Sequence, residues 1–181
     1  MAIKITKQMI EEAVRTYKHK HSIHFELTNE LKPQTLKKAA KHIAIGINEN
    51  DIIAVMAFKG MFGGGKDGMA LSENRLYFSK DYSRFNSNKL SSVDISNFKT
   101  VNKCTSGSLK GHGLTIEYEN GEKISFYTGI FTADILNFFK TLMILRGGDT
   151  EESENKAKKA DPVPEASPKK LKKNLPKPLK K

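Results

Sequence analysis

The sequence predicts an α+β fold in which about seven antiparallel strands are closed by a C-terminal helix and preceded by two N-terminal helices. Apolar residues alternate with polar ones over 114–118, Asn120-Gly121 follows, and the alternation returns at 124–126. This pattern is typical of a β-hairpin. An apolar stripe then recurs at helical spacing over residues 132–145, which predicts the closing helix.

Residues 1–48 are predicted to form an N-terminal helical extension of two amphipathic helices. Thr6 is expected to cap the first helix, and Glu11 stands four residues before Arg15, where the two can pair. Gly46 is expected to end the second helix. The predicted apolar faces are Ile10, Ala13, Val14 and Tyr17 in the first helix, and Leu36, Ala40, Ile43 and Ile47 in the second.

Residues 49–148 are predicted to hold the sheet. The run 52–58 is apolar at every position, as in a strand covered on both faces, and is expected to be the central strand. Asn120-Gly121 is expected to form a type I′ turn. Thr132 is expected to cap the final helix, and Gly147-Gly148 to end it. Further strands are predicted at 69–71, 76–79, 89–95 and 98–102 and on both sides of Asn120-Gly121.

Two segments resemble bacterial pleckstrin-homology-like (GRAM-like) domains. Residues 65–78 read GKDGMALSENRLYF and are similar to the second and third strands of those domains, and residues 89–95 read KLSSVDI and are similar to the next strand. The resemblance covers roughly residues 49–146. It implies a bent antiparallel sheet or partly open barrel capped at one end by the last helix. It implies no activity, because a shared scaffold does not carry a shared function.

Three basic residues, Lys59, Lys66 and Arg75, are the candidate ligand-binding residues. The resemblance implies this role, since many pleckstrin-homology domains hold inositol phosphates with lysines and arginines around the first strand connection. The family's fuller basic pattern on the second strand is absent, because residues 69–72 are Met, Ala, Leu and Ser. An ordinary set of solvated charges is the alternative interpretation.

No catalytic residues are predicted, so the chain is expected not to be an enzyme and to need no cofactor, metal or small-molecule substrate. Residues 60–66 match the first seven positions of a phosphate-binding loop, but Asp67 follows where Ser or Thr must bind magnesium. The cluster His19-x-His21-x-x-His24 has metal-ligand types, but the interleaved lysines disfavour a cation. Cys104 is the only cysteine, which excludes an internal disulfide.

Residues 149–181 are predicted to form a disordered Lys/Pro-rich tail. The whole chain has a formal charge of +11, and this segment has ten lysines, five of the six prolines and no aromatic residue. Such a composition cannot offset the entropy of ordering. Its terminal lysines are candidate polyanion-binding residues for nucleic acid or an anionic membrane, or they only solubilise the chain. These lysines are Lys169, Lys170, Lys172, Lys173, Lys177, Lys180 and Lys181.

The sequence therefore predicts a non-catalytic scaffold that contacts a protein partner or forms a homo-oligomer, with the tail as a weak polyanion anchor. One alternative is an anionic-membrane or phospholipid-binding adaptor, and another is non-specific nucleic-acid association through the tail. The longest apolar run has seven residues, whereas a membrane-spanning helix needs about twenty. The beginning of the chain lacks a secretory pattern. A cytoplasmic location is expected, with peripheral association at the inner membrane surface under the adaptor alternative.

Overall fold

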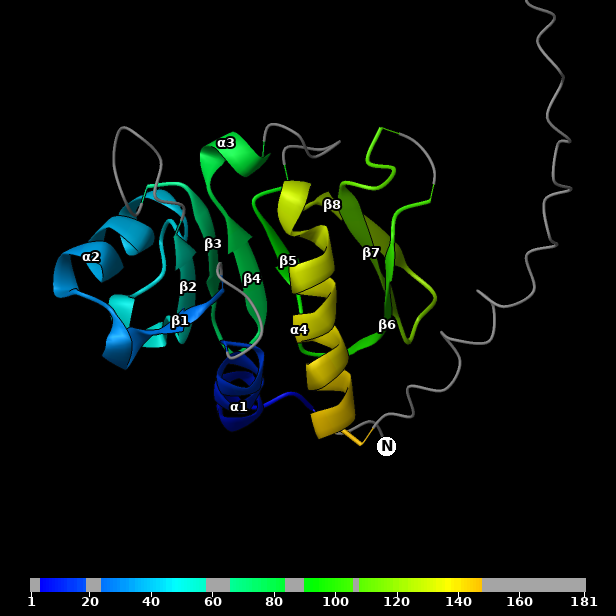
Figure 1. Cartoon of the computed structure of the whole chain (residues 1–181), viewed down its shortest axis with the longest axis horizontal. Coiled ribbons are helices and arrows are strands. Elements are labelled where there is room, and N and C mark those ends of the chain that lie inside the picture. The colour runs from blue at the N-terminus through cyan, green and yellow to red at the C-terminus, as the bar shows by residue number, and fades with distance from the viewer. Residues whose placement is uncertain (1–3, 19–23, 58–65, 84–89, 106–107, 148–181) are drawn as a thin grey trace, which may run out of the picture. The chain divides into compact units, whose positions relative to one another are not determined.

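A computed structural model describes residues 4–18, 24–57, 66–83, 90–105 and 108–147, drawn in colour in Figure 1. This part of the chain is α+β. The helices are α1 (Lys7–Lys18), α2 (Pro33–His42), α3 (Lys80–Ser83) and α4 (Thr132–Leu145), with short 3₁₀ turns at Thr28–Glu30, Glu49–Asp51 and Gly129–Phe131. The strands are β1 (Glu26–Leu27), β2 (Ala54–Ala57), β3 (Gly68–Leu71), β4 (Arg75–Phe78), β5 (Ser92–Asp94), β6 (Phe98–Lys103), β7 (Gly113–Tyr118) and β8 (Lys123–Tyr127).

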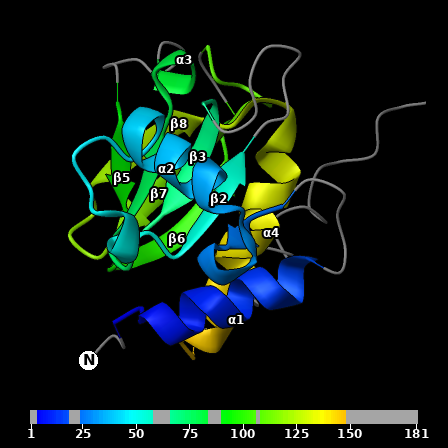
Figure 2. The same ribbon diagram turned by 90° about the vertical axis from the view of Figure 1, so that its left-hand side faces the viewer.

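The strands form two antiparallel sheets, one ordered β1-β2-β3-β4-β5 and the other β6-β7-β8. Strands that follow one another in the chain lie side by side within each sheet, so every sheet connection is local. Helix α4 packs against β6, β7 and α1 (Figure 1). Helix α2 covers the face of the five-stranded sheet that points away from α1 and α4, as the turned view in Figure 2 shows.

Strand β2 is covered on both faces, as its apolar run predicts. Ala54 and Met56 contribute to the main core, whereas Val55 packs with Ala70 and the buried residues of α2. The prediction that this strand is central is wrong, because β2 stands second in the sheet and β3 occupies the middle. The strands stand in chain order, so the middle position falls to β3. The other side of β2 is covered by β1, a two-residue strand that the sequence does not predict and that pairs Leu27 with Ala54.

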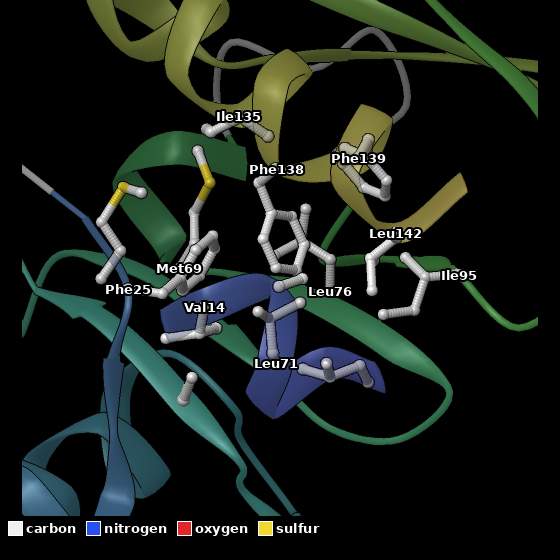
Figure 3. Close-up of a cluster of buried hydrophobic side chains, with 14 of the residues drawn as sticks. Val14, Phe25, Met69, Leu71, Leu76, Ile95, Ile135, Phe138, Phe139 and Leu142 are labelled. Atoms are coloured by element: carbon white, nitrogen blue, oxygen red, sulfur yellow. The ribbon is translucent and has the colours of Figure 1, made fainter. Parts of the chain in front are cut away.

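The main core lies between the sheets and the two helices α1 and α4 (Figure 3). Aromatic rings from α4 join its parts. The ring centroid of Phe138 lies 5.2 Å from that of Phe25, and the Phe139 centroid lies 5.3 Å from Phe98 and 6.4 Å from Phe126. Phe138 and Phe139 are both fully buried. Through these ring contacts, α4 connects the N-terminal segment to the three-stranded sheet.

Helix ends follow local side-chain chemistry at α1 but not at α4. The Thr6 hydroxyl accepts a hydrogen bond from the Met9 backbone N–H (3.3 Å), and Arg15 lies 3.5 Å from Glu11, as expected. Thr132, in contrast, is the first residue of α4, and its hydroxyl donates to the Gly129 carbonyl (2.7 Å). The prediction that Thr132 caps the helix is therefore wrong.

The C-terminal end of α4 is confirmed at Gly147, which has a φ of +79°. This left-handed conformation is the usual way to end a helix, and glycine adopts it without a steric cost. Gly148 lies outside the described residues.

The β7–β8 hairpin is confirmed, but its turn differs from the expected type I′. Gly121 donates to the Tyr118 carbonyl, and the Tyr118 N–H donates to the Glu122 carbonyl, both at 2.9 Å. The loop therefore has three residues, with Gly121 at a φ of +82°. Its geometry is that of a three-residue hairpin loop that ends in a left-handed glycine.

Candidate functional site

The structure does not bring the candidate ligand-binding residues together. Lys66 precedes β3 and Arg75 begins β4, and both are exposed. The register pairs Met69 with Phe78, which places Lys66 and Arg75 at opposite ends of the β3–β4 hairpin. This arrangement corrects the prediction that Lys66 and Arg75 share one basic site, because the length of a strand separates them. Lys59 lies outside the described residues.

The other candidates from the sequence lie largely where the structure describes nothing. His24 is described and half-buried, while His19 and His21 are not described. Among the described residues, no group of three or more His, Cys, Asp and Glu side chains could hold a metal ion. The phosphate-loop match ends at Lys66, and strand β3 follows it, where a phosphate loop requires a helix. The tail lysines Lys169, Lys170, Lys172, Lys173, Lys177, Lys180 and Lys181 also lie outside the described residues.

Two hollows open on the surface of the described residues. The larger, of about 550 Å³, lies between β5 and the β7–β8 hairpin and is called the β5 groove here. The smaller, of about 440 Å³, lies between Lys7, the segment from Ile47 to Ile53 and the turn that precedes β4. Arg75 lines both. The β5 groove is a concave surface bordered by a strand edge, so it is the better candidate for a binding site.

One wall of the β5 groove is the unpaired edge of a strand. Strand β5 is the last in its sheet, so within the described part of the chain no strand pairs with its outer edge. The Ser91 carbonyl and the Ile95 N–H bond toward β4 and its turn, each at 2.8 Å. Backbone groups alternate in direction along an antiparallel strand. Ser92 and Asp94 therefore direct their N–H and C=O groups away from β4.

A second wall comes from the β7–β8 hairpin. Tyr118 ends β7, and its hydroxyl donates to the Asp94 carbonyl (2.8 Å), which ties the hairpin to the outer edge of β5. Leu90, Tyr118 and Ile124 are half-buried and pack against the main core. The groove thus has an apolar wall that is continuous with the interior of the fold.

The charged groups of the groove are mainly acidic. Among the described residues, Asp94, Glu119 and Glu122 line it together with a single cation, Arg75. Arg75 Nη1 donates to Ser92 Oγ (3.0 Å), so its guanidinium is held against β5. Burial raises the pKa of the Tyr118 phenol to about 12, the carboxylates of Asp94 and Glu122 act in the same direction, and Arg75 opposes them.

The Tyr118 phenol is expected to ionise near pH 12, against roughly 10 for an ordinary tyrosine. Since the folded chain favours the neutral phenol, this contribution to stability is complete below about pH 10 and is lost as the pH rises through about 12. The ultraviolet absorbance of phenolate, followed during a pH titration, measures it. Tyr118→Phe should remove the step near pH 12, and Tyr127→Phe should retain it. Loss of the step in Tyr127→Phe alone would contradict the assignment.

Cys104 is buried, as is usual for a lone cysteine, with 7% of its surface exposed. Its sulfur lies 3.2 Å from Thr115 Oγ1, which lies 2.8 Å from Ser125 Oγ. The neighbour of the thiol in these contacts is a hydroxyl group, and its burial is that of a packing residue.

Sequence reasoning alone assigns no binding role to Asp94, Tyr118 or Glu122, which the fold brings together. The only local feature that indicates them is a tyrosine on the inward-facing side of a hairpin, next to acids at its turn.

Comparisons with known proteins add no relative: no protein family, no curated protein and no solved structure matches the chain. Among the described residues, no helix has the length and apolar character needed to cross a membrane.

Proposed function

We propose that the chain is a non-catalytic binding module that contacts another protein through the β5 groove. The observation that carries this proposal is the outer edge of β5, with which no described strand pairs, beside an apolar wall formed by Leu90, Tyr118 and Ile124. Exposed strand edges and half-buried apolar side chains are the features that protein partners use. The Tyr118 hydroxyl is already hydrogen-bonded to the Asp94 carbonyl, so this part of the groove is formed before a partner binds.

A pleckstrin-homology-like scaffold is part of the same proposal. Its support is the topology: local antiparallel strands divided between two sheets, followed by one C-terminal helix that packs on them. Strands β2 to β5 and β6 to β8 number seven, which agrees with the about seven strands expected from the sequence pattern, and β1 adds an eighth at one edge.

Site-specific photo-crosslinking tests the proposed function. A photoreactive amino acid is placed at Asn97 or Glu119, which line the groove, and at Lys41 on α2 as a control. In cells that contain the chain, adducts with one protein are expected from Asn97 and Glu119 and not from Lys41. An adduct with a second copy of the chain would support the homo-oligomer form. Equal adducts from all three positions, or none, would contradict the proposal.

The tail is proposed as a weak polyanion anchor, and this rests on the seven lysines and absence of acids in residues 166–181. Association with anionic membranes and with nucleic acid are the two alternatives of this kind. Both predict binding that weakens steeply with salt. Co-sedimentation with anionic vesicles and titration with duplex DNA distinguish them. A chain that ends at Gly148 should lose either activity if the tail carries it.

A further inference from the structure

We propose that the β5 groove binds an extended basic peptide, which adds as a strand to the outer edge of β5. The inference rests on the proposed function and specifies the partner and the way in which it is recognised. The peptide backbone would pair with Ser92, and positive charge on the peptide would complement the acids of the groove.

Backbone pairing is favoured by the outer edge of β5, with which no strand of the described part of the chain pairs. Ser92 directs both its N–H and its C=O away from β4, toward the side where the groove opens. The next outward carbonyl, that of Asp94, accepts a hydrogen bond from Tyr118. An added strand would lie about 4.8 Å from β5 and pair first with Ser92. Its far end would meet the β7–β8 hairpin, which limits the added strand to a few residues.

The apolar wall fits the side chains of such a strand. Alternate residues of an extended peptide point to opposite faces. One set would contact Leu90, Tyr118 and Ile124, which are half-buried and contact the main core. The other set would face outward, next to the turn of the β7–β8 hairpin. A peptide with alternating apolar and polar residues therefore matches the groove, whereas a helix would not offer its backbone to β5.

The described residues that line the groove favour a basic peptide. Glu119 and Glu122 are exposed at the hairpin turn and Asp94 lies on β5, whereas Arg75 is the single cation among these residues. The Arg75 guanidinium is held by a hydrogen bond to Ser92 Oγ. Arg146 interacts electrostatically with Glu119, and its Cζ lies 5.0 Å from the ring centroid of Phe98. Lys123 pairs with Glu117 (3.2 Å), outside the groove. Acids are thus in excess along the groove, and lysine or arginine complements them.

Ser92→Pro separates strand addition from other binding modes. Proline removes the outward N–H of Ser92 and is tolerated on an edge strand whose N–H faces solvent. Ser92→Thr is the matched control, because it keeps both the N–H and the hydroxyl. The probe is a fluorescent eight-residue peptide that alternates lysine and valine, titrated by anisotropy into the full-length chain. Companion peptides carry glutamate in place of lysine, or N-methyl groups on alternate backbone nitrogens.

The lysine–valine peptide is expected to bind, and Ser92→Pro is expected to weaken its binding by about tenfold, which corresponds to one lost backbone hydrogen bond. Ser92→Thr should change the affinity by less than about twofold, within the scatter of a conservative surface substitution. N-methylation of the peptide should weaken it as Ser92→Pro does, which keeps the test valid if that variant does not fold. The glutamate peptide should bind about tenfold more weakly or not at all.

The following outcomes would overturn the inference. Equal binding of the N-methylated peptide, or by Ser92→Pro, would exclude strand addition, and equal binding of the glutamate peptide would exclude the charge preference. Absence of binding by the lysine–valine peptide would exclude both. Each of these leaves the photo-crosslinks from Asn97 and Glu119 unaffected, so failure of the inference is distinguishable from failure of the proposed function. If those crosslinks join two copies of the chain instead, the occupant is a second copy and the basic peptide is excluded.

Discussion

Gly68→Ala is expected to destabilise the fold by about 3 kcal/mol or more. Gly68 begins β3 with a φ of +141°, a conformation that residues with a side chain rarely adopt. A Cβ at this position would overlap the carbonyl oxygen of Met56 on the neighbouring strand β2. The backbone of β2 would have to move, although it is buried between the main core and α2. Chemical denaturation of the full-length chain measures the change in the free energy of unfolding.

Gly46→Ala is the matched control for this prediction. Gly46 also has a positive φ, of +86°, but nothing lies within 4 Å of a Cβ built there. Its substitution should cost only the conformational strain, about 1 kcal/mol. If the two variants lose the same stability, the close approach of β2 and β3 at Gly68 has no energetic weight and the prediction fails.

Phe139→Ala is expected to cost about 3 to 5 kcal/mol, the range for removing a buried aromatic side chain from a core. Phe139 is fully buried, and its ring lies 5.3 Å from that of Phe98, edge to face, and 5.6 Å from that of Phe138. The truncation leaves a cavity at the point where α4 meets the three-stranded sheet. Denaturant unfolding measures the loss, which near-ultraviolet circular dichroism of the aromatic side chains should follow.

Two further variants calibrate the Phe139 result. Phe139→Leu keeps most of the buried volume and should cost less than Phe139→Ala, about 1.5 kcal/mol. Asn137→Ala lies on the exposed side of α4 and should stay within about 0.5 kcal/mol of the parent chain. A loss below about 1 kcal/mol for Phe139→Ala would mean that this contact does not hold α4 on the sheet.

Long periodic patterns account for the parts of the fold that the sequence predicts. Residues 114–126 alternate over two strands, and 132–145 repeat at helical spacing over four turns, so each pattern carries several independent positions. The three elements that these two patterns predict are observed close to the expected bounds, as β7, β8 and α4. Strand β1 has two residues, Glu26 and Leu27, and no period can be recognised in two positions. Only its pairing with β2 makes it a strand, which is a tertiary property.

The candidate site was harder to predict because it depends on register. Lys66 and Arg75 are nine positions apart in the sequence, but the antiparallel turn between β3 and β4 places them at opposite ends of the hairpin. Asp94 and Tyr118 are much further apart in the sequence and are joined by a hydrogen bond. Closeness in the sequence therefore suggests a shared site for Lys66 and Arg75, which are far apart, and not for Asp94 and Tyr118, which are in contact. The side chains that converge belong to different sheets, whose relative placement no local pattern encodes.

The burial of Cys104 makes it a built-in reporter of local opening. Its thiol is buried and lies against Thr115 of β7, so an alkylating reagent reaches it when the structure around it opens or the whole chain unfolds. The labelling rate therefore measures how often this part of the three-stranded sheet opens under native conditions. A peptide that ties β5 to the β7–β8 hairpin should slow that labelling without touching the cysteine, and no engineered probe is needed to observe it.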